Sequence, residues 1–264
     1  MIVADFRINM SSDVEKRQNI ERQLARQPQL DWEIFPAIVG RELTPDQITR
    51  LCSPQFYPNG NHSLAEAGCA LSHRSVYQKI ADENISYALV LEDDAILPPP
   101  KYLDFSDLED ILLSDEPVII QMSCGYKYKL SNFQRKLKNE RKLYRLFGSY
   151  NAVSYLINLA AAKILSEALL PIRFVADDFK EIIKLGIHTY GIVPRLVTYP
   201  DGCGEVGQSK IISKPTFSQQ IKQKITQAYL KINNGIEYIR GYRNCWKKKD
   251  VPPMPWEDTP DTPN

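Results

Sequence analysis

Three acidic residues in a row, Glu92, Asp93 and Asp94, directly follow the apolar run from Tyr87 to Leu91. An apolar run of this length is typical of a strand that a parallel sheet buries on both faces. Adjacent carboxylates repel one another and lose hydration there, so stability alone does not favour them. A divalent cation would relieve the repulsion, because hard cations take carboxylate oxygens as ligands. Two interpretations stay open at this point: a solvated loop with surplus charge, and a metal site at the carboxyl end of a strand.

A second acidic pair, Asp177 and Asp178, precedes an expected helix. As N-cap residues, these aspartates would stabilise the helix start by about 1 kcal/mol. Alternatively, one of them is a general base that removes the proton from a sugar hydroxyl, which a carboxylate can do at neutral pH. Two acidic centres together with basic stretches indicate an anionic, metal-bound substrate such as a nucleotide diphosphate. The metal would then offset charge on the leaving diphosphate.

Other phosphate-binding and nucleophilic motifs are missing from the sequence. The clustered glycines, Gly202, Gly204 and Gly207, lack the lysine and the helix start of a P-loop. No GxGxxG motif follows a strand, so NAD use is not expected, and the lack of a GxSxG elbow disfavours a serine hydrolase. His73 on a helix and His188 before a strand can each be a structural side chain or a ligand.

The helices and strands that must position these acids alternate along the chain. Apolar patterning predicts strands over 2–8, 31–39, 87–91, 117–122, 149–158 and 189–197, and helices over 14–27, 64–83, 104–113, 160–170 and 179–185. This alternation predicts an α/β fold in which helices sandwich a sheet. The turn-rich stretch 41–63 suits a long active-site loop, and 126–145 is a basic run.

The bulk composition is that of an ordinary globular protein, with a net charge of +1 and a hydrophobic content of 43%. The five cysteines are scattered without a CxxC pair, which argues against a zinc site and a disulfide framework and fits a reducing compartment. The sequence shows no export signal and no run of about 20 apolar residues that could span a membrane. We therefore expect the catalytic body in the cytoplasm, with no nucleic-acid partner.

The C-terminal part differs in composition from the rest of the chain. Apolar residues recur at steps of three or four from Phe217 to Ile239, which predicts one face of a helix. Ten basic residues oppose two acidic ones over 210–250. This helix either packs on the domain with its charges in water or lies on an anionic membrane surface. We expect a catalytic domain over 1–212, a basic amphipathic helical segment over 213–250 and a disordered tail over 251–264.

Several segments, in the same order along the chain, resemble glycosyltransferase family 25. This family holds the bacterial lipopolysaccharide and lipooligosaccharide glycosyltransferases and is related to the collagen galactosyltransferases. The resemblance covers about residues 2 to 212, and Met10 and Val39 depart from its usual pattern. It rests on Arg7-Ile-Asn-Met10 with Arg17, Phe35-Pro-Ala-Ile-Val-Gly40, Ala65-Glu-Ala-Gly-Cys-Ala-Leu-Ser-His73, Leu91-Glu-Asp-Asp94 and Val175-Ala-Asp-Asp-Phe179.

The resemblance implies a GT-A-like fold with a mixed, mostly parallel central sheet flanked by helices. It implies inverting transfer of a hexose, galactose or glucose, from a UDP-sugar to a lipid-linked oligosaccharide, with Mn²⁺ or Mg²⁺ as cofactor. The basic segments would then meet a phosphorylated acceptor at the inner face of the bacterial inner membrane. The implied site residues are Asp94 and Glu92 for the metal, Asp177 (favoured) or Asp178 as base, Asn9, Arg17, Ala37, Ile38 and Asp93 at the nucleotide end, and Glu66, Gly68, Ser72 and His73 on the donor side.

Two other classes of function remain as alternatives. A metal-dependent nucleotidyltransferase that makes a sugar nucleotide would also place strand-end acids on a nucleotide. A carbohydrate- or membrane-binding protein with a decayed catalytic site is the second, and the intact triplet from Glu92 to Asp94 argues against it.

Overall fold

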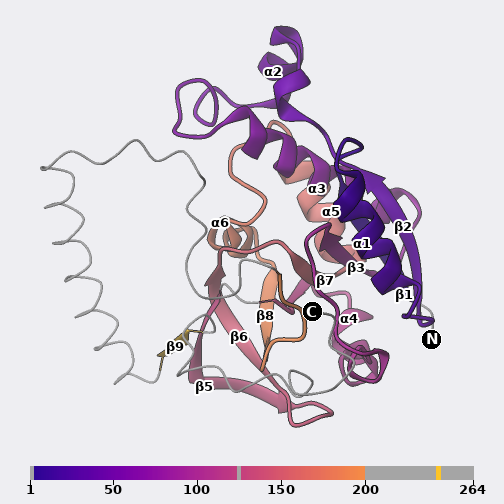
Figure 1. Cartoon of the computed structure of the whole chain (residues 1–264). Coiled ribbons are helices and arrows are strands. Elements are labelled where there is room, and N and C mark those ends of the chain that lie inside the picture. The colour runs from indigo at the N-terminus through magenta and orange to yellow at the C-terminus, as the bar shows by residue number, and fades with distance from the viewer. Residues whose placement is uncertain (1–2, 124–125, 200–241, 245–264) are drawn as a thin grey trace, which may run out of the picture.

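One nine-stranded sheet runs through the residues that the computed structural model describes, which are 3–123, 126–199 and 242–244 (Figure 1). The strand order is β2-β1-β3-β7-β4-β8-β6-β5-β9. The strands are β1 (Val3–Asn9), β2 (Leu30–Pro36), β3 (Tyr87–Glu92), β4 (Val118–Gln121), β5 (Tyr126–Lys136), β6 (Lys142–Ser149), β7 (Ser154–Asn158), β8 (His188–Val193) and β9 (Tyr242–Asn244).

Most neighbouring strands in this sheet are antiparallel, so the prediction of a mostly parallel sheet is wrong. β1 is parallel to β2 and β3, and β4 is parallel to β8. β7 lies antiparallel between β3 and β4, and β6, β5 and β9 continue the sheet beyond β8 in antiparallel pairs. A parallel pair needs a crossover of about a dozen residues or more, which the connection 137–141 between β5 and β6 is too short to supply.

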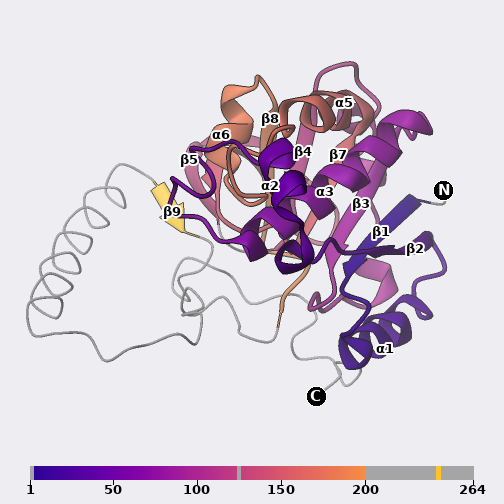
Figure 2. The ribbon, with the colours of Figure 1, turned by 90° about the horizontal axis from the view of Figure 1, so that it is seen from above.

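Helices cover both faces of the sheet, which confirms the α/β prediction. Two hydrophobic clusters mark the faces: α3, α5 and α6 pack in one, and α1 and α4 pack in the other. Figure 2 shows α1 and α3 on opposite sides of β1 and β3. The helices are α1 (Val14–Leu24), α2 (Pro45–Leu51), α3 (Leu64–Asp82), α4 (Glu109–Leu112), α5 (Leu159–Ala168) and α6 (Phe179–Lys184), with 3-10 turns at Gly40–Glu42, Pro100–Tyr102 and Ser106–Leu108.

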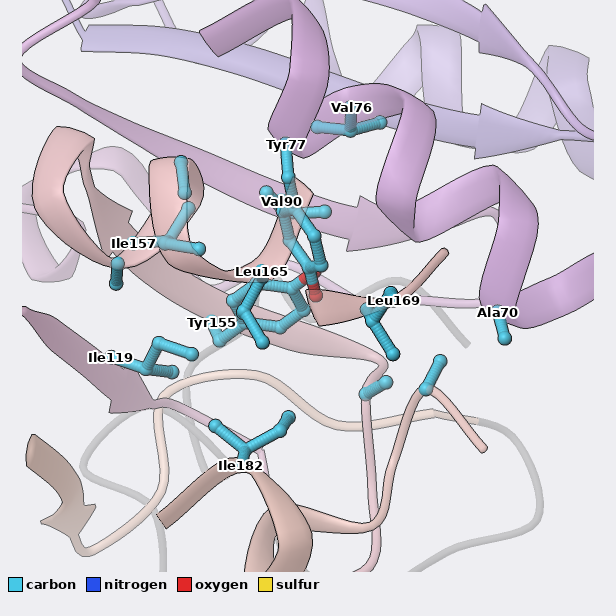
Figure 3. Packing of buried hydrophobic residues seen from close by; sticks show 14 of the residues in the cluster. Ala70, Val76, Tyr77, Val90, Ile119, Tyr155, Ile157, Leu165, Leu169 and Ile182 are labelled. Atoms are coloured by element: carbon cyan, nitrogen blue, oxygen red, sulfur yellow. The ribbon is translucent and has the colours of Figure 1, made fainter. Parts of the chain in front are cut away.

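β3 is buried on both faces, as its apolar run predicts. Leu89 and Leu91 pack in the cluster with α1, whereas Val90 packs in the cluster with α3 and α5. Successive strand side chains point to opposite faces, so a central strand needs apolar residues throughout. Figure 3 shows Val90 of β3 and Tyr155 of β7 against Tyr77 of α3 and Leu165 of α5. The acids at the end of β3 are therefore attached to a strand that is packed on both faces.

Some predicted elements differ in extent from those observed. The helix expected over 14–27 ends at Leu24, and the helix expected over 104–113 is a 3-10 turn followed by the short α4. The expected loop 41–63 contains α2, which begins at a capping box between Thr44 and Gln47. The expected strand 149–158 is interrupted, because β6 ends at Ser149 and β7 begins at Ser154.

The prediction of a helix over 213–250 is wrong at Tyr242–Asn244, because these residues form the strand β9. These residues pair antiparallel with Lys127–Lys129 of β5, so pairing of backbone groups along an open sheet edge decides their structure. The remainder of 213–250 and the tail predicted over 251–264 lie outside the described residues. Among the described helices, none has the length and apolar character needed to cross a membrane.

Candidate active site

The site is built at the edge of the sheet where β1 and β3 end. The two strands are parallel and Ile8 is in register with Glu92, so Asn9 and the acidic triplet reach the same edge. The Glu92 N–H donates to the carbonyl oxygen of Val153, 3.0 Å away, which ties the strand end to the start of β7. The Glu92 side chain is 29% exposed and faces two cavities.

The first cavity has a volume of about 470 Å³ and lies between the end of β1, the segment 37–41 and α3. Two basic side chains, Lys16 and Arg41, and two acidic ones, Glu92 and Asp93, line it, so cations and carboxylates face the same space. Six of the residues predicted for the donor or metal site also line it: Ala37, Ile38, Ser72, His73, Glu92 and Asp93.

Ser72 and Gly68 fix the segment that forms this cavity's wall. The Ser72 hydroxyl donates to the carbonyl oxygen of Gly68 (2.7 Å) and accepts from the backbone N–H of Ile38 (2.8 Å). A Cβ on Gly68 would lie 2.5 Å from both the Gly40 nitrogen and the Ile38 oxygen, so only glycine lets the segment approach α3 this closely. Ser72 and Gly68 therefore shape the predicted donor side by fixing the backbone of Ile38 and Gly40.

Replacement of Gly68 by alanine should therefore disturb this wall. We expect the free energy of unfolding to fall by about 1–3 kcal/mol, because the added Cβ meets backbone atoms that cannot move away cheaply. Urea unfolding measures the change, and the affinity for UDP should fall with it. The control is Gly148→Ala, whose Cβ would meet only the flexible side chain of Lys180. Equal stability of the Gly68→Ala variant and the wild type would contradict the close packing.

The three strand-end acids have different surroundings. Asp93 is paired on both oxygens: Asn9 Nδ2 donates to Oδ2 (2.9 Å) and Lys16 Nζ donates to Oδ1 (3.1 Å). Asp94 Oδ1 is buried and has no hydrogen-bond partner among the described residues. Burial, with the charges of Glu92 and Asp93, raises the pKa of Asp94 to about 6, although Lys16 opposes the shift. Asp94 is thus the acid of the triplet with a buried, unpaired oxygen, and it lines neither cavity.

A second cavity of about 280 Å³ adjoins the first and shares Cys69 and Glu92 with it. Glu66, Tyr150 and Asp177 also line it, and its lining among the described residues includes no lysine or arginine. Burial, together with the charge of Glu92, raises the pKa of Asp177 above its usual range. The structure therefore brings Asp177 of the late acidic pair and Glu92 of the strand-end triplet to one cavity.

The two late aspartates, Asp177 and Asp178, have different roles in the fold. Asp178 caps α6, because its Oδ1 accepts from the backbone N–H groups of Lys180 (3.2 Å) and Glu181 (3.4 Å). Asp178 lines neither cavity, whereas Asp177 lines the second one. The N-cap interpretation thus holds for Asp178, whereas Asp177 faces the second cavity.

Two other predicted residues lie away from the first cavity. Glu66 closes the capping box of α3 with Ser63, and its carboxylate lines the second cavity. Burial alone would raise the pKa of Glu66. The hydrogen bonds from Ser63 and His62 together have the larger effect, so the pKa of Glu66 is lowered. Arg17 lies on the exposed side of α1, where its Nε donates to Glu21 Oε1 (2.9 Å), and it lines neither cavity.

Three residues, Cys69, His73 and Glu92, lie where the two cavities join. The sequence predicted His73 and Glu92 as site residues, but not Cys69. Cys69 Sγ, a ring nitrogen of His73 and a carboxylate oxygen of Glu92 lie within 4.8 Å of one another. Cys69 is exposed to the cavities, yet the loss of hydration at its thiol, with the charges of Glu92, Asp177 and Glu66, raises the pKa of that thiol. A thiol, an imidazole and one carboxylate suit softer cations, whereas Mg²⁺ and Mn²⁺ prefer carboxylate oxygens. A hard cation therefore fits the unused oxygen of Asp94 better than it fits this group.

Comparison with known proteins identifies the family. The chain belongs to glycosyltransferase family 25, described as an LPS biosynthesis protein family, whose model matches residues 3–180. This confirms the family predicted from the sequence motifs.

The relatives include proteins from animals and from a bacterium. A "Glycosyltransferase 25 family member" of Drosophila pseudoobscura pseudoobscura is 26% identical over 89% of this chain, which spans 40% of that protein's length. "Procollagen galactosyltransferase 1-A" of Xenopus laevis is 26% identical over 67% of this chain and 30% of its own. "Lipooligosaccharide biosynthesis protein lic2B" of Haemophilus influenzae is 25% identical over 61% of this chain and 62% of its own.

Among solved structures, mannose-1-phosphate geranyltransferase from Thermus thermophilus aligns with 75% of this chain and 75% of its own. The TM-score is 0.30 and the sequence identity is 10%, values too low to carry an argument about fold or function.

Proposed function

We propose that this chain transfers a hexose, galactose or glucose, from a UDP-sugar to a lipooligosaccharide or lipopolysaccharide acceptor. The transfer is metal-dependent and inverting, on a GT-A-like domain. The observation that carries the proposal is the pair of adjoining cavities that share Glu92. A donor and an acceptor held in two such cavities meet at their common wall. The printed names of two relatives, a lipooligosaccharide biosynthesis protein and a procollagen galactosyltransferase, support the choice of acceptor and donor.

The first cavity takes the UDP-sugar. Its two cations, Lys16 and Arg41, suit a diphosphate, and Ala37 and Ile38 offer apolar surface in the same wall. Asn9 and Lys16 both donate hydrogen bonds to Asp93, so the Asp93 carboxylate and the Lys16 ammonium keep fixed positions at this edge of the sheet. Arg17 is left out of the donor site in this proposal, because its guanidinium is paired with Glu21 on the exposed face of α1.

Asp94 and Glu92 are the residues that would hold Mn²⁺ or Mg²⁺. The buried Asp94 Oδ1 fits this role because it has no partner among the described residues, and a carboxylate oxygen is a preferred ligand of both ions. Asp93 fits less well, since both of its oxygens are already paired. A bound cation would supply positive charge to offset the leaving diphosphate.

Asp177 is the proposed base for the acceptor hydroxyl. It lines the second cavity, and burial keeps its pKa raised, so the carboxylate is a better proton acceptor than a solvated one. The proton of the attacking hydroxyl moves to the Asp177 carboxylate as the hydroxyl oxygen bonds to the anomeric carbon of the donor sugar and the bond from that carbon to UDP breaks. Asp178 does not take this role, because its Oδ1 is occupied by backbone N–H groups of α6.

The second cavity takes the accepting sugar ring. Its lining carries the carboxylates of Glu66, Glu92 and Asp177 without a lysine or arginine among the described residues. Carboxylates accept hydrogen bonds from sugar hydroxyls and repel phosphates, so the ring that enters is uncharged. A phosphorylated part of the acceptor would have to contact the protein elsewhere.

The basic C-terminal segment is proposed to contact the anionic inner leaflet. The support is its sequence, with ten basic residues against two acidic ones over 210–250. Changing Lys247, Lys248 and Lys249 to glutamine should lower binding to anionic vesicles in a sedimentation assay while leaving β9 in place. Each lysine near such a surface contributes about 1 kcal/mol, so loss of the three should weaken binding by about 3 kcal/mol, or roughly a hundredfold. Undiminished sedimentation with anionic vesicles would remove the membrane role.

A donor screen tests the proposed reaction against the nucleotidyltransferase alternative. The protein is incubated with several UDP-sugars, Mn²⁺ and a truncated lipooligosaccharide, and the released nucleotide is measured. Release of UDP with a gain of one hexose in the acceptor supports sugar transfer. Consumption of UTP with release of pyrophosphate would support the alternative, and the lack of both reactions would support a decayed site.

A further inference from the structure

A stripe of polar side chains on α3 leads from the cavities into the core. Cys69, His73 and Tyr77 follow one another at intervals of four residues, which places them in a row along one helix face. Cys69 lines both cavities, His73 lines the first, and His73 and Tyr77 are buried. Polar groups in a core destabilise the fold unless each is hydrogen-bonded, so the partners of His73 and Tyr77 need to be found.

Tyr155 of β7 supplies the partner for both residues. Its hydroxyl oxygen lies 2.7 Å from His73 Nδ1 and 2.7 Å from the Tyr77 hydroxyl oxygen. On the other side of the ring, His73 Nε2 lies 3.2 Å from Glu92 Oε1. Figure 3 shows Tyr77 and Tyr155 converging between α3 and β7. A continuous chain of hydrogen bonds therefore joins Tyr77, Tyr155, His73 and Glu92.

The donors and acceptors of this chain fit in one direction. Burial holds the pKa of Tyr155 well above its usual value and raises that of Tyr77, so both phenols keep their protons. If Tyr77 donates to Tyr155 and Tyr155 donates to Nδ1, the proton of a neutral His73 ring is on Nε2 and points at Glu92. The reverse direction would set an Nε2 lone pair against a carboxylate oxygen, which is repulsive.

We infer that Tyr155 and Tyr77 are positioning residues that hold the His73 ring at Nδ1, so that its Nε2–H donates to the Glu92 carboxylate in the wall between the two cavities. His73 occupies Oε1, and Oε2 has no hydrogen-bond partner among the described residues. A carboxylate held by one oxygen presents the other in a constant direction. The consequence for turnover rests on the proposed function, whereas the tautomer does not.

The tautomer can be read directly from the imidazole nitrogens. The chain has three histidines, so ¹⁵N–¹H correlation spectra of the wild type and of His62→Gln and His188→Gln variants assign the His73 signals. We expect a single ring proton on Nε2 of His73, hydrogen-bonded to Glu92, and none on Nδ1. In Tyr155→Phe, Nδ1 loses its hydrogen-bond donor while Glu92 still favours a proton on Nε2, so the Nδ1 resonance should move toward that of a ring nitrogen without a hydrogen bond. A wild-type ring protonated on Nδ1 would overturn the inference.

Turnover provides the second readout. Tyr155→Phe keeps the buried ring and removes one hydroxyl, so we expect kcat to fall about tenfold while KM for the UDP-sugar stays unchanged. The matched control is Tyr144→Phe, because Tyr144 is a buried tyrosine of β6 in a separate cluster with Tyr126 and Tyr128. Thermal unfolding of both variants checks that each is folded.

The outcomes separate the inference from the proposed function. A lower kcat in Tyr155→Phe with an unchanged Nδ1 resonance would overturn the inference, because the hydroxyl would then act on packing alone. An unchanged kcat together with a shifted Nδ1 resonance would also overturn it. If no UDP-sugar is used by the wild type, the proposed function fails, and the wild-type tautomer still decides whether the hydrogen-bond chain exists.

Discussion

Replacing Asp94 by asparagine should lower the rate of hexose transfer by about 1,000-fold or more. The amide cannot supply the anionic oxygen that the buried Asp94 Oδ1 offers, so the bound cation and the charge that it brings to the diphosphate would be lost. Initial rates of UDP release at saturating Mn²⁺ measure the effect. Calorimetric titration should show that Mn²⁺ no longer strengthens UDP binding.

The control for this variant is Asp115→Asn, an exposed carboxylate outside the site. It removes the same charge from the molecule and should leave transfer unchanged. Full activity of Asp94→Asn, with the control behaving as expected, would remove Asp94 from the metal site and shift attention to Glu92 or Asp93.

The same variant should be more stable than the wild type in metal-free buffer. The pKa of Asp94 is raised from 3.8 to about 6 in the folded protein, so ionisation of this carboxyl opposes folding. The cost is absent below pH 4, grows as the pH rises from about 4 to about 6, and then stays constant at about 3 kcal/mol. Thermal unfolding at two pH values checks the sign: the gain in Asp94→Asn should be seen at neutral pH and vanish in acid. Added Mn²⁺ should stabilise the wild type and not the variant.

Replacing Asp177 by asparagine should lower kcat by about 100- to 10,000-fold, the usual contribution of a general base. The carboxylate faces the second cavity, and no other late acid does so, since Asp178 caps α6. KM for the UDP-sugar should change little, because Asp177 lines only the acceptor cavity. Since burial raises the pKa of Asp177, the wild-type rate should fall in acid at a pH above the usual aspartate value of about 3.9.

Asp178→Asn is the matched variant for this test. Asparagine is as good an N-cap as aspartate, so the change removes the charge and keeps α6 capped. We expect the variant to retain most of its turnover. Loss of turnover in Asp178→Asn with turnover retained in Asp177→Asn would reverse the assignment of the base.

The strand-end site could be predicted from the sequence because its chemistry follows directly on a buried strand. The carboxyl ends of parallel strands meet at one edge of a sheet, so Asn9 and the triplet from Glu92 to Asp94 had to approach one another. The distinction among the three acids could not be predicted. It depends on side-chain partners from α1 and β1, such as Lys16 and Asn9, that occupy Asp93 and leave Asp94 Oδ1 unpaired.

The second cavity and the His73 contacts depend on the antiparallel half of the sheet. β7 brings Tyr155 beside β3, and the segment after β6 brings Tyr150 to the cavity. The basic run 126–145 hid the β5–β6 hairpin, although Tyr126 and Tyr128 alternate with Lys127 and Lys129 at strand spacing. The many basic residues favoured a charged surface segment, whereas the alternation of tyrosine and lysine with a period of two predicts a strand.

One measurement tests the metal-dependent sugar transfer most directly. Wild-type protein is incubated with a radiolabelled UDP-hexose and a truncated lipooligosaccharide, first with Mn²⁺, then with excess chelator, and then with Mn²⁺ restored. The account predicts label in the acceptor with Mn²⁺, background label with the chelator, and recovery when Mn²⁺ is added back. Undiminished transfer in excess chelator would contradict the role of Asp94 and Glu92 as metal ligands, and the absence of label in all three samples would contradict sugar transfer itself.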